Sequence, residues 1–161
     1  MNFLLEINYY FLTFAVVLSY LIGSVSFGII VARLMNLGNL RSIGSGNIGA
    51  TNVLRTGNKT AAALTVLLDG GKGYLVIYAT ISFFEEAYLP LTGIAVFLGH
   101  TFPIYYKFKG GKGVATFLGV ILATNGLIGI TVCGTWLLLA ILSQKSSLAA
   151  LGCSLATPLF L

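Results

Sequence analysis

The stretch "YYFLTFAVVLSYLI" (residues 9–22) contains no charged side chain, and the apolar run continues to Met35 with Arg33 as its first charge. A helix needs about 20 apolar residues to cross a bilayer, so residues 9–35 are long enough for a membrane span. No basic residue precedes the run, and Glu6 lies just before it. The pattern therefore predicts a retained first span and not a cleaved signal peptide.

The chain as a whole is strongly apolar, with 57% apolar residues, 8% charged residues and a mean hydropathy of +0.97 over 161 residues. Soluble proteins have about 25% charged residues, so this chain has too little charge to cover a soluble domain. Its long, continuous apolar runs also exclude the short alternating strands of a membrane β-barrel. The composition predicts an all-α fold, a polytopic integral membrane helical bundle with about five hydrophobic segments.

The apolar runs place these segments at residues 9–35, 60–84, 87–106, 114–142 and 148–161. Two of them are interrupted, the second by "DGGKG" (69–73) and the fourth near "TNG" (124–126), which leaves open a split into short helices. If residues 114–142 form one tilted span, Lys145 and Ser147 lie outside the cell. If they form two short helices that fold back, both residues return to the cytoplasmic side.

Basic residues gather in the loops at residues 36–59 and 107–113, whereas the loop between these two carries Glu85 and Glu86 and no basic residue. Lys and Arg are enriched in cytoplasmic loops. The first and third loops are therefore predicted to face the cytoplasm, and the amino terminus to face outside. The same rule accounts for the net charge of +5, which gives no indication of a nucleic-acid partner.

The first basic loop contains "GSGNIGATN" (44–52), which matches the G-x-G-x-x-G pattern of dinucleotide-binding proteins. That motif needs a strand before it, and here a membrane segment and a basic loop precede it. Its glycines can still turn backbone N–H groups toward an anion. The stretch is a candidate phosphate site, and the alternative is a flexible turn between two spans. Four neutral donors and one charged donor accompany the glycines: Ser45, Asn47, Thr51, Asn52 and Arg55.

The third loop, "KFKGGKG" (107–113), is a second candidate phosphate site. A lysine close to glycine-rich backbone suits a phosphoryl group, and the alternative is an ordinary positive-inside loop. The loop places three lysines among three glycines: Lys107, Lys109, Lys112, Gly110, Gly111 and Gly113.

Polar residues at the membrane segments supply further candidates. His100 is the only histidine and lies where the third segment approaches the cytoplasmic face, so it either lines a site or has a structural role. Asp69 and Lys72 are three positions apart in the second segment. Charges within a membrane indicate function, and the alternative is a structural pair at a helix break. Ser147 is a weak candidate by itself.

Several catalytic patterns are missing from the sequence: a plausibly spaced Ser-His-Asp triad, paired carboxylates and a Cys/His cluster. Cys133 and Cys153 lie in apolar segments and are predicted to be buried small hydrophobes. No metal site and no cofactor is predicted. An enzyme built from these residues to act on phosphates would work by positioning its substrates and neutralising charge, with the general base coming from the substrate.

Four stretches resemble, in order, the bacterial acyl-phosphate:glycerol-3-phosphate acyltransferase family: "GSGNIGATNVLR" (44–55), "LLDGGKG" (67–73), "GHTFPIYYKFKGGKGVAT" (99–116) and "SSLAAL" (146–151). The resemblance implies an enzyme of the bacterial inner membrane that moves a fatty acyl group from acyl phosphate to the 1-hydroxyl of glycerol 3-phosphate. The products are lysophosphatidic acid and inorganic phosphate. Its partners are these two substrates and membrane lipid, without nucleic acid or cofactor.

The resemblance covers nearly the whole chain, so residues 1–161 are expected to form a single membrane-embedded acyltransferase domain. Two departures from the family pattern stand out. Ser26 occupies a position where the family usually has proline, which implies a local change in helix shape. The family also has a longer carboxyl-terminal region, so the domain is expected to be incomplete at that end.

The resemblance also implies roles for individual residues. The loop from Ser45 to Asn52 would hold the phosphate of the acyl donor, and Arg55 and Lys112 would bind phosphate and stabilise charge on the leaving group. His100 would line the site, and Ser147 would help to hold glycerol phosphate. The expected site comprises catalytic Arg55, Lys112 and His100, substrate-binding Ser45, Gly46, Asn47, Gly49, Thr51, Asn52, Gly110, Gly111, Gly113 and Ser147, and the supporting pair Asp69 and Lys72.

Two other functions fit parts of the sequence. Interrupted helices with glycine-rich ends also suit a transporter of phosphate or of a phosphorylated metabolite, although the basic motifs lie at the membrane edges. A carboxyl-terminally incomplete chain also suits an inactive fragment or a helper subunit of another membrane enzyme.

Overall fold

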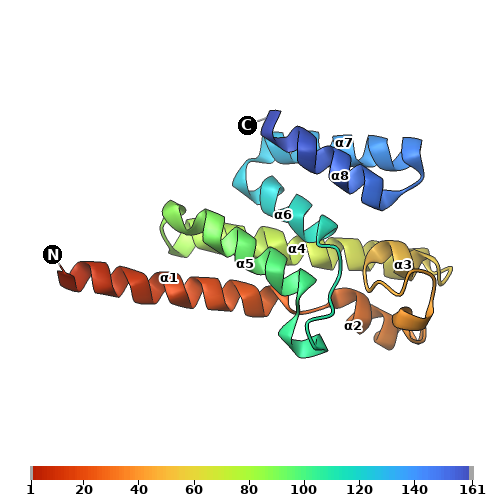
Figure 1. Ribbon diagram of the computed structural model, residues 1–161, viewed down its shortest axis with the longest axis horizontal. Coiled ribbons are helices and arrows are strands. Elements are labelled where there is room, and N and C mark those ends of the chain that lie inside the picture. Colours follow the sequence, from red (N-terminus) through yellow and green to blue (C-terminus); the bar gives the residue numbers. More distant parts are fainter. Residues whose placement is uncertain (1, 160–161) are drawn as a thin grey trace.

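The computed structural model describes residues 2–159, and the side chains of residues 8–159. This part of the chain is helical and contains no strand, which confirms the all-α prediction (Figure 1). Its helices are α1 (Asn2–Gly23), α2 (Phe27–Leu34), α3 (Ala50–Leu54), α4 (Lys59–Phe83), α5 (Leu89–Thr101), α6 (Val114–Thr124), α7 (Gly126–Ser143) and α8 (Ser146–Ala156). Single 3₁₀ turns occur at Leu40–Ser42, Glu86–Tyr88, Ile104–Tyr106 and Thr157–Leu159.

Within the described residues, 4 helical segments are long and apolar enough to cross a membrane. Two shorter apolar helices, Val114–Thr124 and Ser146–Leu159, accompany them. Many large apolar side chains on these helices remain exposed, which suits contact with lipid. The prediction of a multi-pass membrane bundle is therefore confirmed. The spanning segments are Asn8–Leu34, Lys59–Phe83, Glu86–Tyr106 and Gly126–Ser143.

The first segment is divided into two helices, although the sequence predicts one continuous run. The break lies between α1 and α2, where Ser26 has extended backbone angles (φ −96°, ψ 91°). It leaves the carbonyl of Val25 outside the helical hydrogen-bond ladder, and this oxygen accepts a hydrogen bond from Lys72 Nζ at 2.6 Å. The break thus turns a backbone acceptor toward the interior of the bundle.

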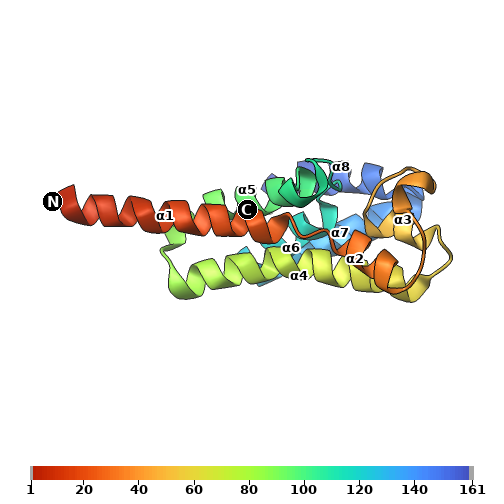
Figure 2. The ribbon, with the colours of Figure 1, turned by 90° about the horizontal axis from the view of Figure 1, so that it is seen from below.

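The predicted interruption of the second segment at residues 69–73 is wrong, because α4 continues through it as one helix. The glycines there serve close packing against α6 instead. A Cβ atom at Gly73 would overlap the carbonyl of Thr116, and one at Gly119 would overlap the carbonyl of Gly70. Small residues let helix backbones approach closely in membranes, and α4 and α6 accordingly lie side by side (Figures 1 and 2).

The fourth segment is split, and the fold-back alternative is the one observed. Asn125 has extended backbone angles between α6 and α7, and its side chain caps α7 by accepting a hydrogen bond from the Ile128 N–H at 3.1 Å. The chain then turns at Gln144 into α8, which packs along α7 (Figure 1). Ser146 Oγ receives a hydrogen bond from Thr51 Oγ1 at 3.0 Å. Residues 144–147 therefore lie at the same end of the bundle as the first loop.

The bundle is elongated, with its polar loops at one end. Figures 1 and 2 show the amino-terminal end of α1 and the α4–α5 connection toward one end, and α2 and α3 toward the other. This arrangement brings loop 36–58, loop 102–113 and residues 144–147 around one region of the molecule.

Candidate functional site

A cavity of about 250 Å³ lies where these loops meet α4, α6 and α7. Most of its polar lining comes from the first and third loops and from the α7–α8 turn. The lining residues are Ser45, Asn47, Gly49, Ala50, Thr51, Asn52, Arg55, Thr65, Val66, Asp69, His100, Lys112, Gly113, Val114, Ala115, Leu118, Trp136, Gln144, Lys145, Ser146 and Ser147.

The glycine-rich loop is held in shape by Asn52, whose side chain is only 1% exposed. Its Oδ1 accepts hydrogen bonds from the backbone N–H of Ser45 at 3.1 Å and from Arg55 Nη1 at 3.4 Å. Its Nδ2 donates to the carbonyl of Leu40 at 2.8 Å. Gly44 has a φ of 53°, in the left-handed region that glycine tolerates best. Asn52 therefore ties the loop to the arginine that follows it.

Arg55 and Lys112 bring positive charge to the cavity from two different loops. Both are exposed, and neither forms an ion pair with a carboxylate in the described part of the chain. An arginine can bind a phosphate through two parallel hydrogen bonds, and a lysine supplies a point charge. The two side chains thus suit an anionic group entering the cavity.

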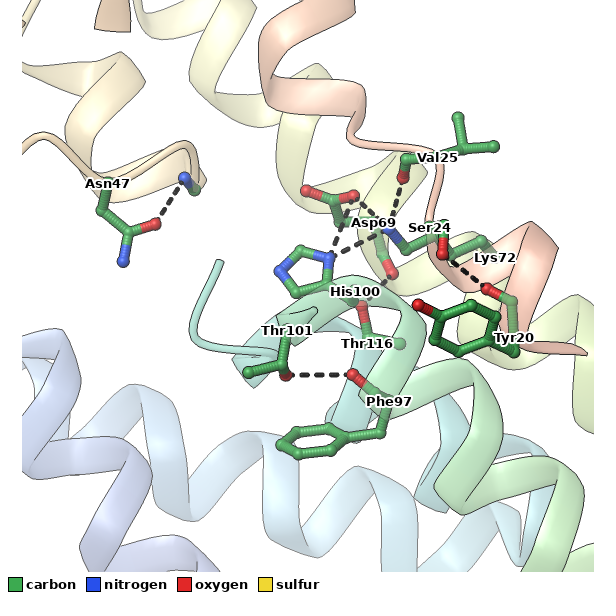
Figure 3. Close-up of polar contacts among 11 residues, drawn as sticks. Tyr20, Ser24, Val25, Asn47, Asp69, Lys72, Phe97, His100, Thr101 and Thr116 are labelled. Carbon is green, nitrogen blue, oxygen red and sulfur yellow. Dashed lines mark hydrogen bonds and ion pairs between the residues drawn. The ribbon is translucent and has the colours of Figure 1, made fainter. Parts of the chain in front are cut away.

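A buried polar cluster adjoins the cavity, and its contacts are shown in Figure 3. Asp69, Lys72 and His100 are each less than 5% exposed. Lys72 Nζ lies 2.9 Å from Asp69 Oδ1 as an ion pair and 2.9 Å from His100 Nδ1 as a hydrogen bond. His100 Nδ1 lies farther from Asp69 Oδ1, at 3.5 Å. The pair predicted from its spacing is thus part of a cluster of three, of which Asp69 and His100 line the cavity.

The cavity also has an apolar wall, formed by four side chains: Val66, Val114, Leu118 and Trp136. The Trp136 indole Nε1 is buried and has no hydrogen-bond partner among the described residues. A cavity whose lining combines cationic and hydroxyl groups with apolar side chains suits an amphipathic ligand.

Most of the site residues expected from the sequence line this cavity. Four others lie outside its lining: Gly46, Gly110, Gly111 and Lys72. The backbone N–H groups of Gly110 and Gly111 donate to the carbonyls of Thr101 and His100, each at 3.1 Å. These two N–H groups are therefore not the free donors that the glycine-lysine pattern suggests. The predicted residues in the lining are Ser45, Asn47, Gly49, Thr51, Asn52, Arg55, Asp69, His100, Lys112, Gly113 and Ser147.

Several lining residues were not predicted as part of a site. Trp136 and Leu118 belong to apolar helices, and nothing in their local sequence distinguishes them from lipid-facing residues. Lys145 and Ser146 belong to the polar stretch "SQKSS" (143–147), whose composition is the signal that could have identified them.

A second, more open cavity of about 610 Å³ lies beside α2 and contains Arg33, Arg41 and Tyr106. It lacks His100, Lys112 and Ser147, so the predicted site coincides with the smaller cavity. Within the described residues, no group of three or more His, Cys, Asp or Glu side chains is placed to hold a metal ion.

Comparison with known proteins gives one family. Residues 13–161 match the family described as glycerol-3-phosphate acyltransferase. The glycerol-3-phosphate acyltransferase of Jannaschia sp. (strain CCS1) is 53% identical over 156 residues, which cover 97% of this chain and 77% of that protein. That of Bordetella pertussis (strain Tohama I) is 50% identical over 149 residues, covering 90% and 69%.

Solved structures agree with the sequence comparison. The crystal structure of PlsY, an integral membrane glycerol 3-phosphate acyltransferase, in its glycerol 3-phosphate form, superposes with a TM-score of 0.85 at 39% identity. The superposed part covers 92% of this chain and 75% of the PlsY chain. The lysophosphatidic acid form gives a TM-score of 0.82 at 37% identity. By sequence and by fold, this chain belongs to the glycerol-3-phosphate acyltransferase family of integral membrane enzymes.

Proposed function

We propose that this acyltransferase moves a fatty acyl group from acyl phosphate to the 1-hydroxyl of glycerol 3-phosphate, releasing lysophosphatidic acid and inorganic phosphate. The observation that carries the proposal is the mixed polar and apolar lining of the cavity. Its donors and cations suit the phosphates of both substrates, and its apolar wall suits the first carbons of an acyl chain.

The acyl phosphate binds with its phosphate between the loop of residues 45–52, Arg55 and Lys112. Its acyl chain runs past Val66 and Leu118 toward the lipid. Trp136 Nε1–H, which lacks a protein partner among the described residues, donates to the acyl carbonyl oxygen. Ser147 and its neighbours at the α7–α8 turn hold the glycerol phosphate.

The 1-hydroxyl oxygen attacks the acyl carbonyl carbon, the new ester bond forms, and the bond between that carbon and the phosphate oxygen breaks. The hydroxyl proton passes to the departing phosphate, because Asp69, the one carboxylate in the lining, is paired with Lys72. Arg55, Lys112 and His100 stabilise the charge that collects on the phosphate. In this mechanism the protein positions the two substrates and stabilises the charge on the leaving phosphate.

The reaction takes place at the cytoplasmic face of the bacterial inner membrane, within a single domain formed by residues 1–161. Gly46, Gly110 and Gly111 support the shape of the two loops and do not touch the substrates. Asp69 and Lys72 contact His100 at Nδ1 and support its position.

The test is release of inorganic phosphate by the purified protein in lipid nanodiscs. Release that requires both acyl phosphate and glycerol 3-phosphate, with lysophosphatidic acid as the second product, supports the proposal. Acylation of glycerol 3-phosphate from a thioester donor, without use of acyl phosphate, would contradict the assigned donor. Uptake of phosphate into vesicles without acyl transfer would contradict the reaction itself.

A further inference from the structure

The buried ammonium of Lys72 faces a carbonyl oxygen, a ring nitrogen and a carboxylate oxygen. An ammonium carries three N–H donors and no acceptor. Lys72 Nζ lies 2.6 Å from the carbonyl of Val25, 2.9 Å from His100 Nδ1 and 2.9 Å from Asp69 Oδ1. The ring of Phe27 lies 5.8 Å from the same nitrogen, a further contact that favours a cation.

The neutral form of Lys72 does not fit this cluster. Asp69 is only 3% exposed, and Lys72 is the one Lys or Arg side chain that forms an ion pair with it in the described part of the chain. A buried carboxylate without a cation is costly. Asp69 and Lys72 are therefore both charged, and they neutralise each other.

A charged Lys72 determines where His100 carries its proton. In a neutral imidazole one nitrogen is a donor and the other an acceptor. A proton on Nδ1 would point at the ammonium 2.9 Å away, so two donors would face each other. The competing acceptor, Asp69 Oδ1, is 3.5 Å from Nδ1, longer than ordinary hydrogen bonds. Nδ1 must accept, and the proton must lie on Nε2. A doubly protonated ring meets the same conflict at Nδ1.

The protonated nitrogen is the one without a protein partner. Figure 3 shows Nε2 on the side of the ring away from Lys72, and His100 lines the cavity. Among the described residues no hydrogen bond to Nε2 occurs. A Cβ atom at Gly111 would overlap Nε2, so glycine at this position leaves room at the nitrogen.

We infer that Lys72 fixes His100 in the tautomer with its proton on Nε2, so that His100 presents a permanent hydrogen-bond donor to a phosphoryl group in the cavity and cannot act there as a base. The identity of the bound group rests on the proposed function, whereas the tautomer does not. Lys72 is on this view a positioning residue that acts through His100.

The single histidine of the chain makes the tautomer directly measurable. The protein is labelled with nitrogen-15 histidine, reconstituted in lipid nanodiscs and studied by NMR near neutral pH, where the chemical shift of each ring nitrogen reports whether it carries a proton. We expect an unprotonated Nδ1 and a protonated Nε2. An unprotonated Nε2, or a doubly protonated ring, would overturn the inference whatever the enzyme's activity.

Inorganic phosphate, a product of the proposed reaction, is then added to the labelled protein. We expect the Nε2 signal to move and the Nδ1 signal to stay nearly constant. If neither signal responds while the tautomer is as expected, the contact with the phosphoryl group is wrong and the tautomer assignment stands.

The variant Lys72→Met tests the cause. With the ammonium removed, Asp69 is the nearest acceptor for Nδ1, so we expect Nδ1 to become protonated and turnover to fall by about 10²-fold. Persistence of an unprotonated Nδ1 would show that Lys72 does not set the tautomer. Thr80→Val is the matched control, because Thr80 is equally buried on α4 but hydrogen-bonds only to Val76 and Thr92. If Lys72→Met does not fold, the wild-type spectrum still decides the tautomer.

Discussion

In the proposed reaction, charge stabilisation depends mainly on Arg55 and Lys112. Arg55 follows α3 and is oriented by Asn52 Oδ1, whereas Lys112 lies in the loop before α6. The two charges therefore approach the cavity from separate parts of the chain. A phosphate held between them is bound more strongly as it gains charge during acyl transfer.

Replacing either residue by alanine should lower turnover by about 10²- to 10³-fold, because one charged donor to the leaving phosphate is lost. Arg55→Ala and Lys112→Ala are to be compared by phosphate release under saturating substrates. Arg33→Ala is the matched control, since Arg33 is an exposed arginine that lines the other cavity. Near-wild-type turnover in both site variants would show that the phosphate binds elsewhere.

Asn52 is expected to matter for stability as well as for activity. Asn52→Ala removes the acceptor for Ser45 and Arg55 and one of two donors to the Leu40 carbonyl, which also accepts from the Ile43 N–H at 3.3 Å. Each lost hydrogen bond costs about 0.5–1.5 kcal/mol. We expect a lower melting temperature and a higher KM for acyl phosphate. Asn39→Ala, which removes an exposed cap outside this cavity, should leave the KM unchanged, and equal effects of the two variants on the KM would contradict this role.

Trp136 tests the apolar wall of the site. Trp136→Phe keeps an aromatic ring in the wall but removes the buried indole N–H that has no partner among the described residues. A hydrogen bond is worth about 1 kcal/mol, or roughly a fivefold change in an equilibrium. We expect turnover with acyl phosphate to fall by about that factor while glycerol 3-phosphate KM is unchanged. Unchanged kinetics with both substrates would exclude the proposed donor role.

At the level of helices, the contact between α4 and α6 positions both walls of the cavity. Asp69 lies on α4, and Val114 and Leu118 lie on α6. The hydroxyl of Thr116 donates to the Asp69 carbonyl at 2.9 Å, which joins the two helices next to the buried cluster. Close approach at Gly73 is a condition for this bond, because the Thr116 backbone occupies the space that a side chain would fill.

Gly73→Ala and Gly71→Ala form a matched pair two positions apart on α4. The Cβ at position 73 would strike the Thr116 carbonyl, whereas a Cβ at position 71 meets nothing within 4 Å. Overpacking costs about 1–3 kcal/mol, so we expect Gly73→Ala to lower the melting temperature in detergent. Gly71→Ala should raise it slightly, because alanine is the better helix former by about 0.5–1 kcal/mol. Equal shifts would mean that α6 does not pack on α4 as described.

Features of the helices that are determined by neighbouring residues in the sequence could be predicted. Hydropathy and loop charge predict the spanning segments. The cluster of small hydrogen-bond donors predicts the loop of residues 44–52 as a candidate phosphate site. The role of Gly73 in close packing depends instead on which helix crosses it. From the sequence alone, the same glycine indicates a break in the helix. The position of Ser147 depends on the turn at Asn125, and that of Trp136 on which face of α7 meets the loops. Such contacts depend on tertiary packing that one sequence does not reveal.

Over the whole molecule, charge is segregated between the two ends. Lys72 is paired inside the bundle, and the remaining basic residues lie in or next to the loops around the cavity: Arg33, Arg41, Arg55, Lys59, Lys107, Lys109, Lys112 and Lys145. Glu85 and Glu86 lie in the α4–α5 connection at the opposite end of α4 from α3 (Figure 1). The observed fold-back of α6 and α7 strengthens this segregation, because it adds Lys145 to the basic end. A single orientation in the membrane, with the basic end at the cytoplasmic face, therefore agrees with the enrichment of Lys and Arg in cytoplasmic loops.

That orientation predicts which positions react with a membrane-impermeant maleimide in intact bacteria. Cys133 and Cys153 are first replaced by alanine, and activity confirms that the cysteine-free protein is folded. Ser42→Cys and Glu86→Cys then place a thiol at exposed positions at opposite ends of the bundle, and neither substitution removes a Lys or Arg that determines topology. Glu86→Cys should react in intact cells, and Ser42→Cys only after permeabilisation. The reverse pattern would put the phosphate-binding loops outside the cell, away from a cytoplasmic supply of glycerol 3-phosphate, and would contradict both the orientation and the proposed route of the acceptor.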